Sequence, residues 1–144
     1  MSGDGDGVPS KSNLKILVVD DHPDCLHSMA ELLRILGHQL QEARGTLEAI
    51  SFAQEFLPDI VMLELNLRGL SGYELSQYFV QVHTVQQKRP FLMAVTNAGT
   101  PQERKRSAEA GIDVHLVKPV DPIVLEVTLS LLKNGDWIRS RAQA

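Results

Sequence analysis

Ile16-Leu17-Val18-Val19-Asp20-Asp21, residues 16–21, is the stretch that decides the fold, with four apolar residues followed at once by two acids. A short continuous apolar run of this kind is typical of a strand buried on both faces of a parallel sheet. Three further runs have the same form, each ending in a polar residue. They are residues 60–63 before Glu64, 91–95 before Thr96 and 114–117 before Lys118.

Helical patterns alternate with these runs along the whole chain. Strands are predicted at about 15–19, 39–43, 59–63, 91–95 and 114–117, and helices at about 23–36, 45–56, 71–82, 100–110 and 122–132. Such alternation indicates βαβ units, and therefore an α/β, doubly wound parallel sheet in a three-layer α/β/α arrangement. The weakly apolar second strand fits a sheet edge and the strand order 2-1-3-4-5, which places the switch point between the first and third strands.

The polar residues that follow the strands are expected to converge, because the carboxyl ends of parallel strands meet at one edge of a sheet. Asp20, Asp21 and Glu64 would then bring three carboxylates into one crevice, where a cation or a lysine must neutralise them. Lys118 supplies an amine and Thr96 a hydroxyl donor, a set that suits a divalent cation and a phosphoryl group.

Each of these residues also has an ordinary structural interpretation. Asp21 alone could cap the next helix, Thr96 alone could be a turn residue, and Lys118 alone could be a solvated side chain. Cys25, the single cysteine, is expected to be a small core or boundary residue. The joint placement at four strand ends favours a functional site.

Length and composition restrict the class of protein. The 144 residues, 43% hydrophobic and 22% charged, are typical of one globular domain, here residues 14–133 between a disordered leader at 1–13 and a tail at 134–144. A net charge of −4 argues against nucleic-acid binding. The sequence has no signal peptide and no membrane-spanning run, so we expect a cytoplasmic protein that does not bind membranes.

The chain resembles the receiver domain of bacterial two-component response regulators. The resemblance rests on the acid pair after the first strand, the stretch 58–63, the loop to Gly72, Val95-Thr96, Ala110-Gly111 and Lys118-Pro119, in this order and spacing. It implies a flavodoxin-like (βα)5 fold and a role in phosphorelay signal transduction, with no enzyme activity. It also implies a sensor histidine kinase or a phosphotransfer protein as partner, unless that link has been lost.

The resemblance carries functional roles onto matching positions. It implies that Asp20 and Asp21 hold Mg²⁺, with the backbone carbonyl of Asn66 as a further ligand. It implies that Thr96 and Lys118 contact a phosphoryl group at the phosphoacceptor position.

The resemblance also implies features outside that centre. The Lys118–Pro119 peptide bond is expected to be a cis bond. The helices at 100–110 and 122–132 are where this family docks protein partners or forms homodimers.

Four positions depart from the family pattern. Glu64 stands where the family has its phosphoacceptor aspartate, and His115 stands at the switch aromatic, which works together with Thr96. His115 is either a ring that changes rotamer with pH sensitivity or a half-buried edge residue without a signalling role. Asn97 replaces the small residue after the threonine, and Arg68 replaces a common loop proline.

Glu64 decides between the functional hypotheses. Its carboxylate lies one C–C bond further out than that of aspartate, ~1.5 Å, and a misplacement of about 1 Å can slow a reaction on the order of 10²-fold. The same reach could bring the carboxylate to Thr96 and Lys118 in partial imitation of a phosphoryl group. We therefore expect a receiver that is not switched by an aspartyl phosphate, or one that mimics the phosphorylated state.

Two alternatives remain open. The chain could be a conventional phosphorylated receiver whose acceptor was altered by engineering or drift. It could also be a small α/β enzyme or nucleotide-binding protein, since a fold does not determine function. The turn after the first strand lacks the Gly-rich loop of nucleotide sites, which weighs against this last hypothesis.

Overall fold

The computed structural model describes residues 13–82 and 89–133. Of the predicted leader at 1–13, only Asn13 is among them, and the predicted tail at 134–144 lies outside them. Strands and helices alternate strictly along the described chain. Their bounds are β1 Lys15–Val19, α1 Pro23–Ile35, β2 Gln39–Ala43, α2 Thr46–Phe56, β3 Ile60–Leu63, α3 Gly72–Gln81, β4 Phe91–Thr96, α4 Pro101–Glu109, β5 Val114–Val117 and α5 Pro122–Lys133.

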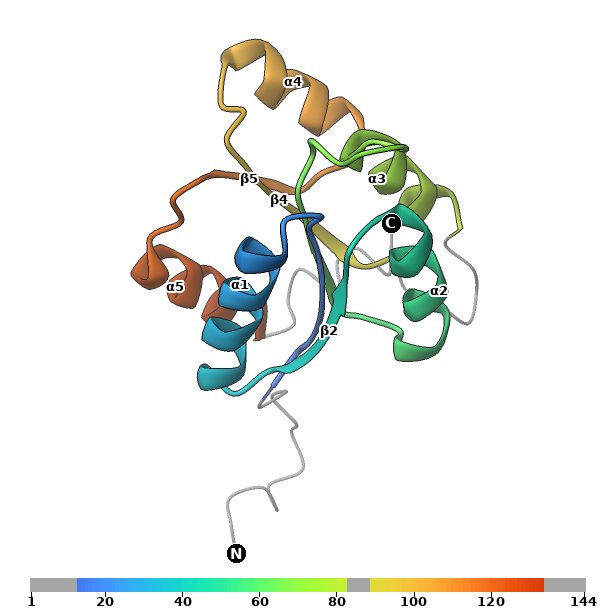
Figure 1. Ribbon diagram of the computed structural model, residues 1–144. Helices are drawn as coiled ribbons and strands as arrows, with labels where there is room; N and C mark the ends of the chain where they lie inside the picture. The colour runs from blue at the N-terminus through green and yellow to red at the C-terminus, as the bar shows by residue number, and fades with distance from the viewer. Residues whose placement is uncertain (1–12, 83–88, 134–144) are drawn as a thin grey trace, which may run out of the picture.

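The five strands form one parallel sheet in the order β2-β1-β3-β4-β5, which confirms the predicted fold class and strand order. Helices lie on both sides of this sheet, with α1 and α5 together on one side and α2 and α3 on the other (Figure 1). No helix among the described residues has both the length and the apolar content to cross a lipid bilayer.

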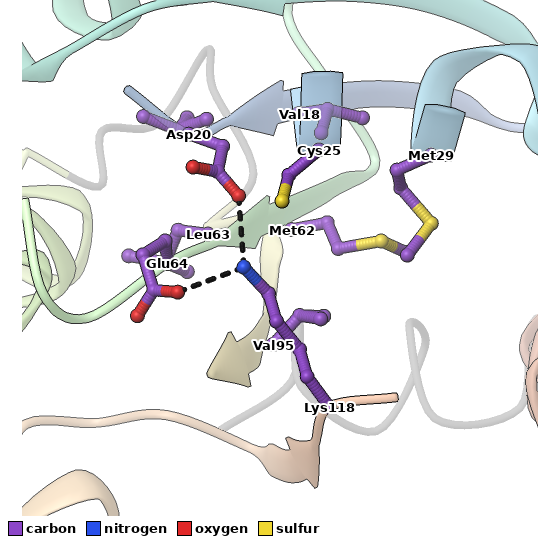
Figure 2. Close-up of a pocket in the computed structure, with 10 residues that line it drawn as sticks. Val18, Asp20, Cys25, Met29, Met62, Leu63, Glu64, Val95 and Lys118 are labelled. Atoms are coloured by element: carbon purple, nitrogen blue, oxygen red, sulfur yellow. Dashed lines mark hydrogen bonds and ion pairs between the residues drawn. The ribbon is translucent and has the colours of Figure 1, made fainter. Parts of the chain in front are cut away.

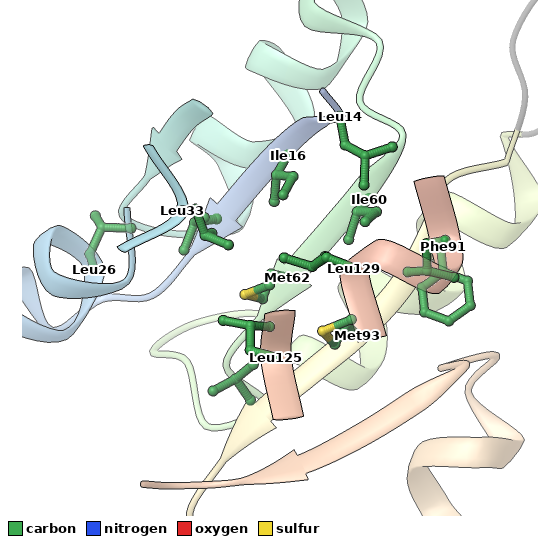
Figure 3. Packing of buried hydrophobic residues seen from close by; sticks show 13 residues of the cluster. Leu14, Ile16, Leu26, Leu33, Ile60, Met62, Phe91, Met93, Leu125 and Leu129 are labelled. Atoms are coloured by element: carbon green, nitrogen blue, oxygen red, sulfur yellow. The ribbon is translucent and has the colours of Figure 1, made fainter. Parts of the chain in front are cut away.

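Two hydrophobic clusters hold the three layers together. Residues of the inner strands alternate between the clusters, because successive side chains of a strand point to opposite faces. Ile16, Ile60 and Met93 belong to the cluster that α1 and α5 cover (Figure 3), whereas Leu17, Val61 and Leu92 belong to the cluster beneath α2 and α3. Both faces of β1, β3 and β4 are thus buried, which explains their continuous apolar runs.

The helix starts follow local sequence signals. Ser71 and Thr100 form capping boxes with Glu74 and Glu103, so both hydroxyls accept the backbone N–H three residues later. The expectation for Cys25 was wrong, because this residue is exposed in the first turn of α1. Only Leu26 among the residues of that turn faces the core.

His38 makes a buried contact that depends on its charge. Its Nδ1 accepts a hydrogen bond of 3.1 Å from the backbone N–H of Leu14, which requires that nitrogen to be unprotonated. Burial, and secondarily the positive charge of Lys133, lower the pKa of His38 below its ordinary value of 6.5. The unfolded chain therefore binds a proton at this residue more readily than the folded protein.

We predict that acid weakens the fold through His38. The free energy of unfolding is expected to fall as the pH drops below about 6.5, by up to about 1.4 kcal/mol per pH unit from this group. Urea denaturation at a series of pH values measures this. The His38→Gln variant is expected to show a smaller fall between neutral and mildly acid pH, and an unchanged pH dependence would contradict the assignment.

Candidate functional site

Four strand ends meet at the carboxyl edge of the sheet, as the sequence predicted. Val19 of β1 pairs with Leu63 of β3, so the acids that follow each strand become neighbours. Thr96 is the last residue of β4, and its backbone carbonyl accepts a hydrogen bond of 2.8 Å from the N–H of Lys118. The side chains of Asp20, Glu64, Thr96 and Lys118 thus share one crevice.

Glu64 lies at the centre of this crevice with both carboxylate oxygens occupied. Its Oε2 accepts hydrogen bonds from the Thr96 hydroxyl at 2.6 Å and from the backbone N–H of Asn66 at 2.9 Å. Its Oε1 accepts one from Lys118 Nζ at 2.9 Å. The Glu64 side chain is only 5% exposed, so these donors replace nearly all of its hydration.

Lys118 joins two of the acids. Its Nζ lies 2.9 Å from Glu64 Oε1 and 3.1 Å from Asp20 Oδ2 (Figure 2). Burial raises the pKa of Glu64, but the hydrogen bonds from Thr96, Asn66 and Lys118 outweigh it, so the net pKa is below the usual value. Burial lowers the pKa of Lys118, and its bonds to Glu64 and Asp20 more than compensate, so its net pKa is raised. Both groups are therefore charged at neutral pH.

One oxygen of the acid pair has no hydrogen-bond partner among the described residues, and its neighbour is His22 Nδ1 at 3.3 Å. Asp21 Oδ2 accepts a hydrogen bond of 3.0 Å from the backbone N–H of Arg68, whereas Asp21 Oδ1 is buried and has no hydrogen-bond partner among the described residues. Asp21 does not cap α1, because the N-cap residue of that helix is His22. A buried carboxylate oxygen without a partner costs free energy unless a cation satisfies it, so the donor set fits a bound metal ion.

Sequence reasoning missed the third member of this cluster. Ligand atoms of Asp20, Asp21 and His22 lie within 4.8 Å of one another, the one such group of His, Cys, Asp and Glu side chains found in the described ranges. The signal was present in the sequence, since His22 directly follows the acid pair. Asn66, assigned to the metal through its carbonyl, has an exposed side chain and contacts Glu64 through its N–H.

A hydrogen-bond path leads from Glu64 to β5. The Thr96 hydroxyl that donates to Glu64 also accepts from the backbone N–H of Ala98 at 3.3 Å. The carbonyl of Ala98 in turn contacts Nε2 of the half-buried His115, and the Lys118–Pro119 peptide bond is cis. Glu64 and His115 are thus connected through Thr96 and the backbone N–H and carbonyl of Ala98.

Gly72, the first residue of α3, packs directly on the backbone behind Glu64. A Cβ at this position would collide with the Glu64 carbonyl oxygen and lie 2.6 Å from Leu65 Cα. We expect the Gly72→Ala variant to lose about 1–3 kcal/mol of unfolding free energy, as overpacked positions do. Urea denaturation measures this, with Gly45→Ala as control because a Cβ there meets nothing within 4 Å. Equal losses in the two variants would contradict the packing argument.

Comparisons with known proteins agree on one family. The family model of the response regulator receiver domain matches residues 16–130. The sensor histidine kinase RcsC of Salmonella typhimurium is 33% identical over 122 residues, which are 85% of this chain and 12% of that protein. The protein PilH of Pseudomonas aeruginosa is 24% identical over 121 residues, 84% of this chain and 98% of PilH.

The fold agrees with solved structures as well. The chemotaxis protein CheY4 of Vibrio cholerae superposes with a TM-score of 0.72 at 26% identity, covering 81% of this chain and 95% of that one. The chain spans only 12–13% of the length of the RcsC kinases that it matches.

Proposed function

The chain belongs to the response regulator receiver domain family, and from that premise we propose that Glu64 takes the place of the phosphoryl group in it. The protein would then be a signalling module of the two-component type that binds its partner without an aspartyl phosphate. The observation that carries this proposal is the triple contact of the Glu64 carboxylate with Thr96, Lys118 and the Asn66 N–H.

The contacts of Glu64 are those that a phosphoryl group would need. Phosphoryl transfer depends on positioning and on charge stabilisation by donors such as a hydroxyl and a lysine. Thr96 and Lys118 are the donors at these strand ends, and both already bind the glutamate. An incoming phosphoryl group would have to displace the carboxylate from its donors, so phosphorylation is disfavoured.

Mg²⁺ is the metal that we propose for the acid pair. Asp20 and Asp21 would hold it with the Asn66 carbonyl, and the ion would supply positive charge to a crevice that contains three carboxylates. The buried Asp21 Oδ1 without a hydrogen-bond partner among the described residues supports this assignment. Lys118 neutralises only part of the charge, because its ammonium contacts Asp20 and Glu64 and not Asp21.

The hydrogen bonds from Glu64 through Thr96 and Ala98 to His115 would couple the occupancy of the site to the conformation near α4. Arg104 of α4 extends this path, since its guanidinium donates to the carbonyls of Gly99 at 3.3 Å and His115 at 3.4 Å. We therefore assign Thr96 and His115 the switch role. In this proposal, the contact of Glu64 with Thr96 already determines the conformation of the surface at α4.

The helices at 100–110 and 122–132 are the proposed docking surface. The helix α5 exposes a stripe of large apolar side chains, which favours contact with a protein partner or a second copy of this chain. The stripe consists of Ile123, Val124, Val127 and Leu131. A sensor histidine kinase or a phosphotransfer protein is the class of partner that we propose from the RcsC relatives.

One alternative has a specific observation in its favour. Asp20, Thr96, Lys118 and Glu64 are joined by hydrogen bonds, which supports the alternative of a conventional phosphorylated receiver whose acceptor was altered. The two hypotheses differ in the state of the wild-type protein. In the first, Glu64 already sets the docking surface; in the second, the docking surface responds only to an aspartyl phosphate, which Glu64→Asp would restore.

We predict that the protein takes up no phosphoryl group. Incubation with acetyl phosphate and Mg²⁺, followed by intact-mass spectrometry, is expected to give the mass of the unmodified chain. The Glu64 carboxylate lies about 1.5 Å too far out and is held by three donors, which is the physical reason. A stoichiometric adduct at Glu64 would overturn the proposal.

A further inference from the structure

We propose that His22 is a third side-chain ligand of the metal site, and that it shifts the preference of this site from Mg²⁺ toward a transition-metal dication such as Co²⁺ or Zn²⁺. The inference rests on the proposed metal site at the acid pair and goes beyond it, because it changes which metal ion would bind there. It would make the receiver responsive to the supply of a transition metal.

The imidazole of His22 lies where a cation between the acids would meet it. Its Nδ1 lies 3.3 Å from Asp21 Oδ1 and 3.5 Å from Asp20 Oδ1. These spacings fit ligand atoms around one ion, since zinc–nitrogen and zinc–oxygen bonds of about 2.0–2.2 Å separate neighbouring ligands by roughly 3–3.5 Å. All three ligand atoms lie within 4.8 Å of one another, close enough to share one ion.

The other oxygens of both acids make contacts outside this cluster. Asp20 Oδ2 accepts from Lys118 Nζ at 3.1 Å, and Asp21 Oδ2 accepts from the Arg68 N–H at 3.0 Å. These contacts turn both Oδ1 atoms toward His22. Asp20 Oδ1 accepts one hydrogen bond, from the backbone N–H of His22 at 2.9 Å, which fixes the position of the histidine main chain.

Glu64 is not available as a third carboxylate ligand. Its Oε1 is bound by Lys118, and its Oε2 is bound by Thr96 and the Asn66 N–H. His22 is the N-cap residue of α1, yet its side chain makes no capping hydrogen bond among the described residues. Its imidazole instead faces one oxygen of each acid, so the site offers two oxygens and one nitrogen from side chains.

A mixed nitrogen and oxygen set selects a different ion from an all-oxygen set. Carboxylates and carbonyls suit Mg²⁺, whereas imidazole suits zinc, copper, iron and nickel, and affinity rises across the divalent series from Mn²⁺ toward Cu²⁺. Replacing one oxygen ligand by imidazole should raise the affinity for Co²⁺ and Zn²⁺ and leave that for Mg²⁺ nearly unchanged.

The test is a metal titration of the full chain after treatment with a chelator. Isothermal calorimetry with Co²⁺ and with Mg²⁺ gives the ratio of the two affinities, and the visible absorption of bound Co²⁺ reports nitrogen ligation independently. The variant is His22→Gln, which removes the imidazole but keeps a polar side chain. His27→Gln is the matched control, because His27 is an exposed histidine of α1 that lies outside the cluster.

The expected result is a selective loss. His22→Gln should lower the Co²⁺ affinity roughly tenfold or more, a magnitude typical of changes to a metal's ligand environment, and shift the Co²⁺ absorption bands. The Mg²⁺ affinity should change less than about threefold, and His27→Gln should match the wild-type protein.

Two outcomes would overturn the inference, and they separate it from the proposed function. Equal Co²⁺ affinity and spectra in the wild-type protein and His22→Gln, with Mg²⁺ still bound, would refute the role of His22 alone. Failure of the wild-type protein to bind either ion would refute both the histidine ligand and the proposed metal site.

Discussion

Glu64→Asp is expected to convert a protein that takes up no phosphoryl group into one that forms a stoichiometric aspartyl phosphate. Shortening the side chain by one C–C bond, ~1.5 Å, withdraws the carboxylate from the donors of Thr96 and Lys118. These two donors then become available to the phosphoryl group. The gain in the rate of uptake should be on the order of 10²-fold or more, because a misplacement of about 1 Å costs that much.

Intact-mass spectrometry with acetyl phosphate and Mg²⁺ measures this gain, and Glu64→Ala is the matched control. The alanine variant also frees Thr96 and Lys118 but offers no carboxylate, so it should remain unmodified. Uptake by both variants would place the phosphate on another residue. No uptake by Glu64→Asp would show that residues other than Glu64 also prevent phosphorylation, and it would contradict our account.

Lys118→Met is expected to destabilise the protein by about 3 kcal/mol, because breaking a buried ion pair leaves an uncompensated charge. Two acids lose their partner at once. Asp20 and Glu64 have side chains only 8% and 5% exposed, and Lys118 is 20% exposed, so water cannot readily replace the ammonium. Chemical denaturation of the variant and the wild-type protein measures the change.

The matched control is Arg34→Met, which breaks the ion pair of Arg34 with Glu42 on the surface. That pair has an N···O distance of 2.8 Å but side chains 45% and 28% exposed, and such pairs contribute about 0.2–1 kcal/mol. Adding Glu64→Gln to Lys118→Met should recover part of the lost stability, because it removes one unpaired charge. A loss in Lys118→Met no larger than in Arg34→Met would contradict the buried pairing.

The architecture could be predicted from the sequence because its signals are local and mutually consistent. The continuous apolar run 16–19 indicates a strand that is buried on both faces. The capping boxes at Ser71 and Thr100 mark helix starts with signals only three residues apart in the sequence. Strand order followed from the weak apolarity of residues 39–43. The convergence of Asp20, Glu64, Thr96 and Lys118 then followed from the geometry of a parallel sheet.

The directions of the site side chains could not be predicted in the same way. Whether Glu64 turns to Thr96 or to the metal depends on which non-local donors compete for it, and Thr96 is 32 residues away. The orientations of Asp20 and Asp21 likewise involve non-local partners, because Lys118 and the Arg68 N–H contact their Oδ2 atoms. Cys25 was expected to be a core or boundary residue because of its residue type, but it is exposed in the first turn of α1.

In the proposed function, Glu64 already holds the molecule in the conformation that a phosphoryl group would impose. Solution NMR measures this conformation through the backbone amide signals of Ala98 and Arg104 and the ring signals of His115. We predict that these signals in the wild-type protein coincide with those of Glu64→Asp after phosphorylation. Coincidence with unphosphorylated Glu64→Asp instead would contradict the claim.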